Sequence, residues 1–276
     1  MSLLRRLSEL HASGERGVLF TVVEGESIGG KELVLETGER VGSGVPAEAI
    51  DQFDVLMRRG RNKLLSLEGE TQVFAEWYGP PPRLFVYGAV DTAESLCRAA
   101  KLLGWTAIVG DARAMFLTKE RMPSADVLIQ KWPEDAIAEL EPDHQTAVVV
   151  LTHDDKFDEP ALKAALASEA FYVGALGSRK TTERRRGRLL EAGVSEEQLA
   201  RIMGPCGLDI GADSQEETAL AILAEILAVR ARRSGGSLRE AKQRIHARST
   251  DVESRPESDS EGAMGRRGSS DGPPGR

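Results

Sequence analysis

The sequence predicts an α/β protein, with a doubly wound parallel sheet preceded by a small α+β domain. Three observations support this fold class. From residue 83 onward, β-type runs alternate with helical patterns, as in βαβ units. The run Thr146–Leu151 is wholly apolar and β-branched apart from its ends, which is typical of a parallel strand covered on both faces. Before residue 79, by contrast, short strands follow one another with little helix between them.

The first βαβ unit lies between residues 83 and 111. Arg83–Tyr87 is a short apolar run of β-forming residues that ends at Gly88. From Ala93 the apolar residues recur at helical spacing, and Thr106–Val109 is a second strand that ends just before Asp111. Strand, glycine turn, helix, strand and acid in this order predict a Rossmann-like sheet.

The phosphate-binding fingerprint of that unit is incomplete. Where G-x-G-x-x-G/A is expected, residues 88–93 read GAVDTA, so the middle glycine is Val90. A β-branched side chain there obstructs the close approach of a pyrophosphate, and Asp91 adds a negative charge at the helix start. The sequence therefore predicts weak or absent NAD(P) binding despite a dinucleotide-type fold.

The amino-terminal part is predicted to form a small domain over residues 1–79. A helix is expected at Ser2–Ala12, and a second helix, entered through residues 42–48 and Pro46, is expected to run to about Arg59. Strands are expected at Gly17–Glu24, Lys31–Glu36, Lys63–Leu67 and Gln72–Trp77. The stiff segment Gly79–Pro82 then marks the domain boundary.

The second domain is predicted over residues 80–233. Its later strands are expected at Val127–Gln130, Thr146–Leu151 and Ala170–Val173. Its later helices are expected at Pro133–Leu140, Ala161–Leu166, Arg179–Ala192, Glu196–Met203 and, behind a capping box at Ser214 and Glu217, from there to about Arg232. Residues 234–276 lack aromatic residues and are rich in Ser, Gly, Pro and charge, which predicts a disordered tail.

Composition narrows the class of protein. The chain has 276 residues, of which 41% are hydrophobic and 29% charged, and a net charge of −8. This acidic balance argues against a nucleic-acid or anionic-membrane surface. No apolar run reaches the ~18 residues of a membrane span, and two distant cysteines make no disulfide framework. We therefore expect a soluble cytoplasmic protein.

Candidate ligand-binding residues lie after the strands of the predicted sheet. The carboxyl ends of parallel strands meet at one edge, where such folds bind ligands. The candidates are Gly88, Ala89, Asp111, Arg113, Thr152, His153, Asp154, Gly174, Gly177, Ser178, Arg179, Gly207 and Asp209. Each turn can also be explained by geometry alone, because strand-to-helix turns need Gly, Ser and Asp.

Several of these residues suggest specific chemistry. His153 could act as a general acid or base or contact a ligand, but no spacing of His, Cys or acid predicts a metal site. Arg179 opens a basic helix against its dipole, so a nearby anion would relieve a conflict, whereas Arg185 further along should matter little. Cys97 is expected in the core, and Cys206, in a glycine-rich loop, is expected to be the more exposed thiol.

The carboxyl-terminal half resembles a known family. The segments TAVVVLTHDDKFDEPALKAALASEAFYVGALGSRKT and GPCGLDIGA are similar to the Rossmann domain of the xanthine dehydrogenase accessory factor family (XdhC/CoxI). The resemblance covers residues 84–230. It implies binding of the molybdenum cofactor (molybdopterin) and help in its sulfuration and insertion into a molybdenum hydroxylase. The implied partners are the apo-hydroxylase and a cysteine desulfurase, with a homodimer left open.

Two motif positions depart from the family pattern. The family's S-G-G-C-x-E is matched by Ser43–Glu48, with Pro46 in place of the cysteine. Its first Rossmann turn, G-A-G-H, is matched by residues 88–91, where Val90 and Asp91 replace glycine and histidine. Either the ligand differs, or cofactor handling relies on the loops 152–154, 174–179 and 204–212.

Three functions are compatible with these observations. The first is a non-catalytic maturation factor for a molybdenum hydroxylase of the xanthine dehydrogenase or carbon monoxide dehydrogenase type, as the resemblance implies. The second is a nicotinamide-dependent oxidoreductase, which the βαβ unit and Asp111 favour and Val90 opposes. The third is a ligand-sensing module that has lost cofactor binding, which the substituted motif positions favour.

Overall fold

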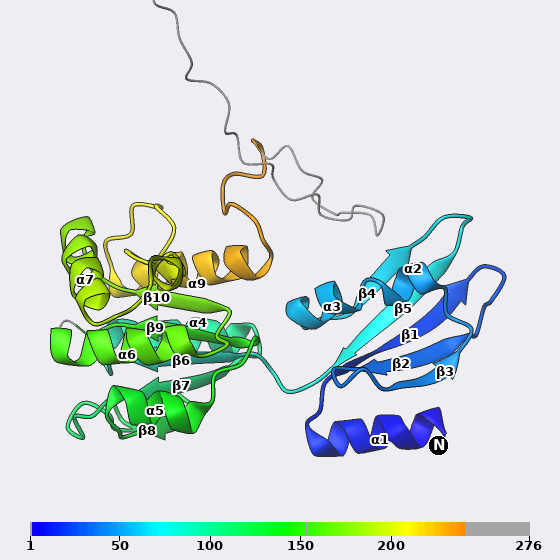
Figure 1. The fold of residues 1–276 in the computed structure, drawn as a ribbon, viewed down its shortest axis with the longest axis horizontal. Helices are drawn as coiled ribbons and strands as arrows, with labels where there is room; N and C mark the ends of the chain where they lie inside the picture. The colour runs from blue at the N-terminus through cyan, green and yellow to red at the C-terminus, as the bar shows by residue number, and fades with distance from the viewer. Residues whose placement is uncertain (1, 153, 241–276) are drawn as a thin grey trace, which may run out of the picture.

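The structure is a computed structural model that describes residues 2–152 and 154–240. Two sheets form two lobes, joined by a single crossing of the chain at residues 79–82 (Figure 1). The part up to Tyr78 is called the small lobe below, and the part from Arg83 onward the large lobe. The prediction of a parallel sheet preceded by an α+β unit is confirmed.

The small lobe is an antiparallel sheet of five strands in the order β3-β2-β1-β5-β4. The residues of β1 alternate between two apolar clusters: Val18, Phe20 and Val22 pack beneath α3, and Leu19 packs towards α1. The elements are α1 (Leu3–Ser13), β1 (Gly17–Glu24), β2 (Lys31–Leu35), β3 (Arg40–Ser43), α2 (Ala47–Ile50), α3 (Phe53–Arg59), β4 (Lys63–Ser66) and β5 (Gln72–Tyr78).

Two details of the small lobe correct the sequence-based prediction. The edge strand β3 was not predicted, because it has only four residues and its one apolar side chain, Val41, is half-buried. Its backbone pairs with β2, and Gly42 sits so close that a Cβ would lie 2.1 Å from the Lys31 carbonyl oxygen. The single helix expected up to Arg59 is also wrong, since α2 and α3 are separated at Asp51 and Gln52.

The large lobe is a parallel sheet of six strands in the order β11-β10-β9-β6-β7-β8. Its strands are β6 (Arg83–Tyr87), β7 (Thr106–Gly110), β8 (Val127–Ile129), β9 (Thr146–Val150), β10 (Tyr172–Ala175) and β11 (Ile202–Met203). The chain builds outward from β6 in one direction and from β9 in the other. The topological switch point, where such sheets bind ligands, therefore lies between the ends of β6 and β9.

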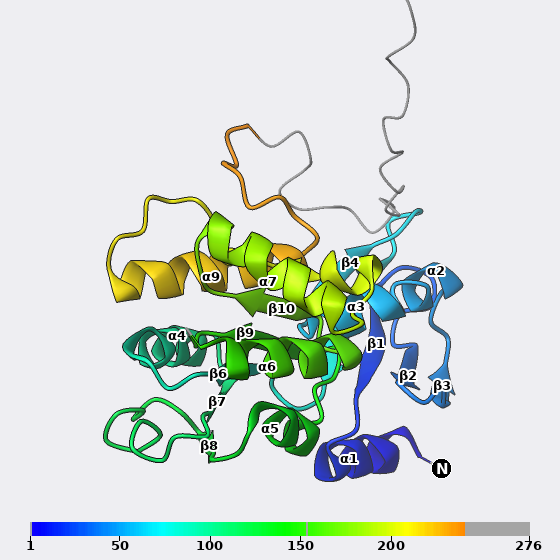
Figure 2. The same ribbon diagram turned by 60° about the vertical axis from the view of Figure 1, so that its left-hand side comes forward.

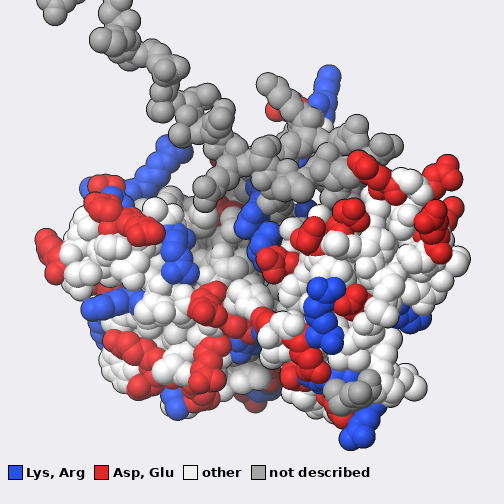
Figure 3. Space-filling view, turned by 45° about the vertical axis from the view of Figure 1, so that its right-hand side comes forward, with Lys and Arg blue, Asp and Glu red and all other residues white. Residues whose placement is uncertain are grey.

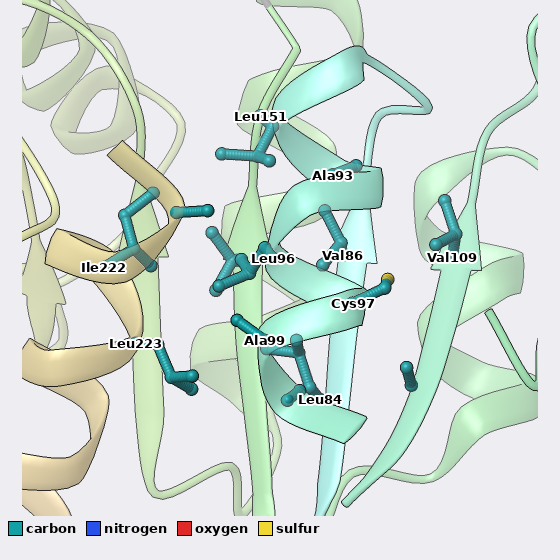
Figure 4. Packing of buried hydrophobic residues seen from close by; sticks show 14 of the residues in the cluster. Leu84, Val86, Ala93, Leu96, Cys97, Ala99, Val109, Leu151, Ile222 and Leu223 are labelled. Carbon is teal, nitrogen blue, oxygen red and sulfur yellow. The ribbon is translucent and has the colours of Figure 1, made fainter. Parts of the chain in front are cut away.

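Helices cover both faces of this sheet (Figures 1 and 2). Along β6, Leu84 and Val86 face α4 and α9, while Phe85 and Tyr87 face the layer of α5 and α6. Figure 4 shows the first layer, in which Leu96 of α4 lies towards Ile222 of α9. The helices are α4 (Asp91–Leu102), α5 (Pro133–Leu140), α6 (Asp155–Ala167), α7 (Arg179–Glu191), α8 (Glu196–Leu199) and α9 (Gln215–Arg230).

One element of the large lobe corrects the prediction. The helix expected over Glu196–Met203 ends at Leu199, and Ile202–Met203 forms the edge strand β11 beside β10. A two-residue strand carries no periodicity of its own, so only its pairing with Val173 and Gly174 identifies it. The expected strand Ala170–Val173 is shifted to Tyr172–Ala175, which places Gly174 inside β10.

The small lobe docks on the amino-terminal edge of the parallel sheet. Gln145, just before β9, donates its amide Nε2 to the Met57 carbonyl oxygen at 2.6 Å. Arg230 at the end of α9 donates to the Gln145 side-chain oxygen at 2.7 Å. Arg16 of the small lobe pairs with Asp143 at 2.5 Å. The carboxyl ends of the strands therefore face away from the small lobe (Figure 1).

The expected tail lies mostly outside the described residues. Residues 234–240 are exposed, and the remainder of the expected tail, from 241 onward, falls beyond the part of the chain that the structure describes. Among the described helices, none combines the length and apolar character needed to cross a membrane. On the face in Figure 3, acidic side chains spread over both lobes with basic ones between them.

Candidate functional site

Five loops meet at the carboxyl-terminal edge of the parallel sheet, which we call the rim. Backbone hydrogen bonds bring their ends together: Gly88 N donates to Gly110 O at 2.8 Å, and Cys206 N donates to Ala175 O at 3.0 Å. Of the residues predicted for the site, those in the described part of the chain lie on or beside the rim, apart from Gly174, which lies within β10.

The turn after β6 is packed too tightly to admit a ligand at the switch point. Gly88 has a φ of 112°, which favours glycine, and a Cβ there would lie 2.8 Å from Thr152 Cγ2 and 2.9 Å from its backbone nitrogen. Gly88 and Ala89 are both buried. The glycine at this turn is thus explained by the close contact between the loops after β6 and β9.

Asp111 occupies the group that a dinucleotide phosphate would use. Its side chain is buried, and its Oδ2 accepts the Ala89 N–H at 2.9 Å. Its carboxylate also forms a bidentate pair with Arg113, at 2.9 and 2.8 Å. Burial opposes ionisation of Asp111, but the hydrogen bonds from Arg113 and Ala89 outweigh it and lower the pKa of the carboxyl. Asp111 therefore serves as an internal anion for this turn.

A buried polar chain runs beneath the rim from β9 to α7. The Thr152 hydroxyl donates to the Asp158 carboxylate, which pairs with Arg185 Nη2 at 2.8 Å. Both charged side chains are 3% exposed. Burial raises the pKa of the Asp158 carboxyl, an effect that Thr152 and Arg185 only partly offset. Arg185 Nη2 also donates to Leu176 O at 3.0 Å, so the pair ties the loop after β10 to α6.

Arg185 corrects an expectation. It was predicted to be a minor residue of a solvated helix face, yet it is buried at the centre of this network. Its Nε and Nη1 atoms are buried without a hydrogen-bond partner among the described residues, as is Thr182 Oγ1 in the first turn of α7. Unpaired buried donors are costly, so a positive charge and unused donors are held directly under the start of this helix.

The start of α7 presents positive charge to solvent. Ser178 caps the helix by accepting the Thr181 N–H at 3.1 Å, and Gly177 before it has a φ of 148°. Arg179 and Lys180 are exposed, and within the described residues neither forms an ion pair. The cations oppose the helix dipole and sit near the buried Arg185, so an anion bound here would relieve the repulsion.

Two glycines of the predicted site are explained by packing. A Cβ on Gly174 would lie 2.6 Å from Cε1 of Tyr172, so the glycine makes room for that ring. Gly207 donates its N–H to Glu225 at 3.0 Å, and the same carboxylate accepts from the Tyr172 hydroxyl at 2.5 Å. Asp209, two residues on, is exposed at the rim.

The expectation for Cys206 is wrong. Its side chain is buried beneath the loop after β11, and burial raises the pKa of the thiol to about 12. A thiol in this state is a poor nucleophile at neutral pH. Cys97 lies in the core, as predicted, and burial likewise raises its pKa to about 12.

The remaining predicted residues are simpler to place. Asp154 is exposed and caps α6 by accepting the Lys156 N–H at 3.2 Å. His153 lies outside the described residues. In the described part of the chain, no three His, Cys, Asp or Glu side chains are grouped so as to hold a metal ion.

Sequence reasoning missed Asp158 and Arg185, although a signal for both was present. Asp158 lies three and four residues before Ala161 and Leu162, on the buried face of α6. Arg185 lies four residues before Leu189, on the buried face of α7. A charged residue on the apolar stripe of a helix has to find a partner in the core, and two such residues of opposite sign indicate a pair.

Comparisons with known proteins follow the same boundaries. A family model described as the XdhC Rossmann domain matches residues 84–226. A Bacillus subtilis protein, named as a probable component of xanthine dehydrogenase, is 33% identical over 162 residues, which cover 59% of this chain and 47% of that protein. The Escherichia coli molybdenum cofactor insertion chaperone PaoD is 31% identical over 157 residues, covering 57% of this chain and 43% of PaoD.

A solved structure extends the similarity to the fold as a whole. A crystal structure described as a xanthine dehydrogenase from Bacillus halodurans aligns with a TM-score of 0.62 at 24% identity. The alignment covers 82% of this chain and 65% of that chain. At this identity the match supports the fold alone. The chain spans less than half the length of the two curated relatives named above.

Proposed function

The chain belongs to the XdhC family, and from that premise we propose that it binds the molybdenum cofactor and helps insert it into a molybdenum hydroxylase. The observation that carries the proposal is the family match over residues 84–226, which includes every loop of the rim. The similarity to a molybdenum cofactor insertion chaperone supports the same role. The hydroxylase would be of the xanthine dehydrogenase or carbon monoxide dehydrogenase type.

The rim has chemistry that fits a cofactor made of a pterin ring and a phosphate. Exposed cations at Arg179 and Lys180 lie at a helix start, above the buried Arg185 with its two unused nitrogens. Phosphate is the kind of group that charged side chains and free helix N–H groups hold together. In a bound cofactor, the molybdenum centre would be the cargo delivered to the hydroxylase, and the chain's own residues would hold the organic part.

The dinucleotide alternative lacks such support. The turn after β6 is closed by Thr152, and Asp111 already accepts the Ala89 N–H. Within the proposal, binding therefore relies on the loops after β9, β10 and β11. This choice explains how the substitutions at Val90 and Asp91 can be tolerated.

The proposal also assigns the two domains. Residues 80–233 would form the cofactor-binding domain, and residues 1–79 a CoxI-like domain that docks on its far edge. A cysteine desulfurase, as the source of the sulfur ligand, and a second copy of this chain are further partners that the family role would require or allow. Pro46 leaves the small domain without a thiol at that motif position.

Reconstitution of a cofactor-free hydroxylase tests the insertion role. The apo-hydroxylase is mixed with free molybdenum cofactor, with and without this chain, and its activity and molybdenum content are followed in time. We expect the chain to raise the rate and final extent of loading. Equal loading with this chain, with an unrelated acidic protein and with buffer would contradict the proposal.

A further inference from the structure

A row of stacked aromatic and cationic side chains crosses the rim on the side of α5 and α6. Trp132 packs on Phe157 with ring centroids 5.2 Å apart. The Arg113 guanidinium carbon lies 5.4 Å from the Phe157 ring centre and 4.5 Å from the Phe116 ring centre. We call these side chains the stacked ridge: Trp132, Phe157, Arg113 and Phe116.

The topology brings these residues to one edge from different strands. Arg113 follows β7, and Trp132 follows β8 as the residue before α5. Phe157 lies in the first turn of α6, after β9. The Lys131 carbonyl accepts a hydrogen bond from the Tyr87 hydroxyl at 3.1 Å, which holds the loop that carries Trp132. The stacked ridge thus lies on the same edge as the start of α7.

The ridge is held in place by contacts beneath it. Phe157 is 4% exposed and forms the buried floor on which Trp132 lies. The Asp111 carboxylate grips Nε and Nη2 of Arg113 and leaves Nη1 outside that pair. Trp132 itself is 54% exposed. A large aromatic face is therefore presented to solvent on a rigid support, so little ordering entropy is lost when a ligand stacks on it.

Charge along the ridge is compensated, unlike charge at the start of α7. Arg113 pairs with Asp111 at 2.8 Å, and the neighbouring Lys156 lies 3.6 Å from Asp154. The ridge therefore offers stacking surface and hydrogen-bond donors rather than net positive charge. These properties suit a flat, polar ring, while the unpaired cations of α7 suit a phosphate.

We propose that the stacked ridge binds the heteroaromatic ring of the ligand, with Trp132 as the stacking surface and Arg113 as a donor to the ring edge. This inference rests on the proposed function and deepens it, because it divides recognition of one cofactor between two parts of the rim. The pterin ring lies on the ridge, and the phosphate lies at the start of α7. Arg113 and Trp132 are then specificity residues for the ring.

The test uses a probe that has the ring and no phosphate. Binding of 6-hydroxymethylpterin to the full chain is measured by equilibrium dialysis and by quenching of tryptophan emission. Trp132→Leu should weaken binding about 5-fold or more, the scale of losing one stacking aromatic, and Trp132→Phe should restore most of it. Thermal melting and far-ultraviolet circular dichroism check that each variant is folded. Leu102→Ala, which removes an 85% exposed side chain at the end of α4, is the surface control.

The results separate the two proposals. Arg179→Ala should leave 6-hydroxymethylpterin binding unchanged, because this probe carries no anion for α7. Equal affinity of the folded Trp132→Leu variant and the wild type, or no binding by either, would overturn the ridge proposal. It would do so even if the chain retained molybdenum cofactor. A chain that binds the pterin through Trp132 yet retains no cofactor would instead leave the ridge standing and refute the proposed function.

Discussion

At the scale of single residues, Asp111 decides which ligands the first Rossmann turn can take. It is the acid that a dinucleotide-binding fold would present to a ribose, but it is buried and accepts hydrogen bonds from Ala89 and Arg113. We therefore predict no saturable NADH binding by the wild-type chain up to high micromolar concentration, measured by NADH fluorescence. Saturable binding that Asp111→Asn abolishes would show that this account of the turn is wrong.

Arg185 provides a residue-scale prediction about stability. Arg185→Ala should destabilise the fold by about 3–5 kcal/mol, because it leaves the Asp158 carboxylate buried without its partner. Arg184→Ala, the neighbouring exposed position, should change the free energy of unfolding by less than about 0.5 kcal/mol. Urea unfolding measures both values. Similar small effects for the two variants would mean that the buried pair contributes little.

The same residues explain what the sequence could and could not predict about the site. The rim loops were predictable, because the strand ends are readable and parallel strands share an edge. The state of each side chain was not. Asp111 and Cys206 lie in turn-like segments, and only the three-dimensional contacts reveal that both are buried. Trp132 and Phe157 are 25 residues apart in sequence, so their stacking has no local signal.

At the scale of elements, β10 depends on a glycine for packing. Gly174→Ala should destabilise the protein by about 1–3 kcal/mol, since the new Cβ would collide with the Tyr172 ring and disturb its hydrogen bond to Glu225. Gly187→Ala is the matched control. It lies inside α7 with no atom near the new Cβ, and should stabilise by about 0.5–1 kcal/mol. Thermal melting of both variants tests the contrast, and a stabilised Gly174→Ala would contradict it.

Elements with strong periodicity were predicted well and short ones were not. Gly17–Glu24, Arg83–Tyr87 and Pro133–Leu140 match the observed bounds. The edge strands β3 and β11 were missed because they are held by backbone pairing with a neighbour, and their side chains show no pattern. Short edge strands are defined by tertiary contacts, which local propensity does not contain.

At the scale of the whole molecule, Asp143 joins the two lobes and makes their docking sensitive to acid. It pairs with Arg16 of the small lobe and Arg83 of the large lobe. Burial opposes its ionisation, but hydrogen bonds from Thr146 and Arg16 hold the pKa well below the ordinary value of about 3.9. The stabilisation is therefore present above pH ~4 and is lost as the pH falls towards the lower folded-state pKa.

Asp143→Asn should accordingly cost about 1.5–3 kcal/mol at pH 7, the scale of a hydrogen bond to a charged group. The difference from wild type should shrink as the pH falls below about 4. Asp135→Asn, an exposed position on α5, should differ little from wild type at either pH. Urea unfolding at pH 7 and near pH 3 gives the comparison. A constant Asp143→Asn penalty across this range would contradict the assignment of the charge to lobe docking.

The central claim is that the rim holds the molybdenum cofactor, and the most direct test is what the purified protein carries. The wild type, Arg179→Ala and Arg184→Ala are each purified from a host that makes the cofactor, and molybdenum and oxidised pterin are measured per chain. We expect molybdenum and pterin in equal amounts in the wild type and Arg184→Ala. We expect about 10-fold or greater weakening in Arg179→Ala, for the loss of a charged hydrogen bond. A wild-type protein free of both molybdenum and pterin would contradict the account.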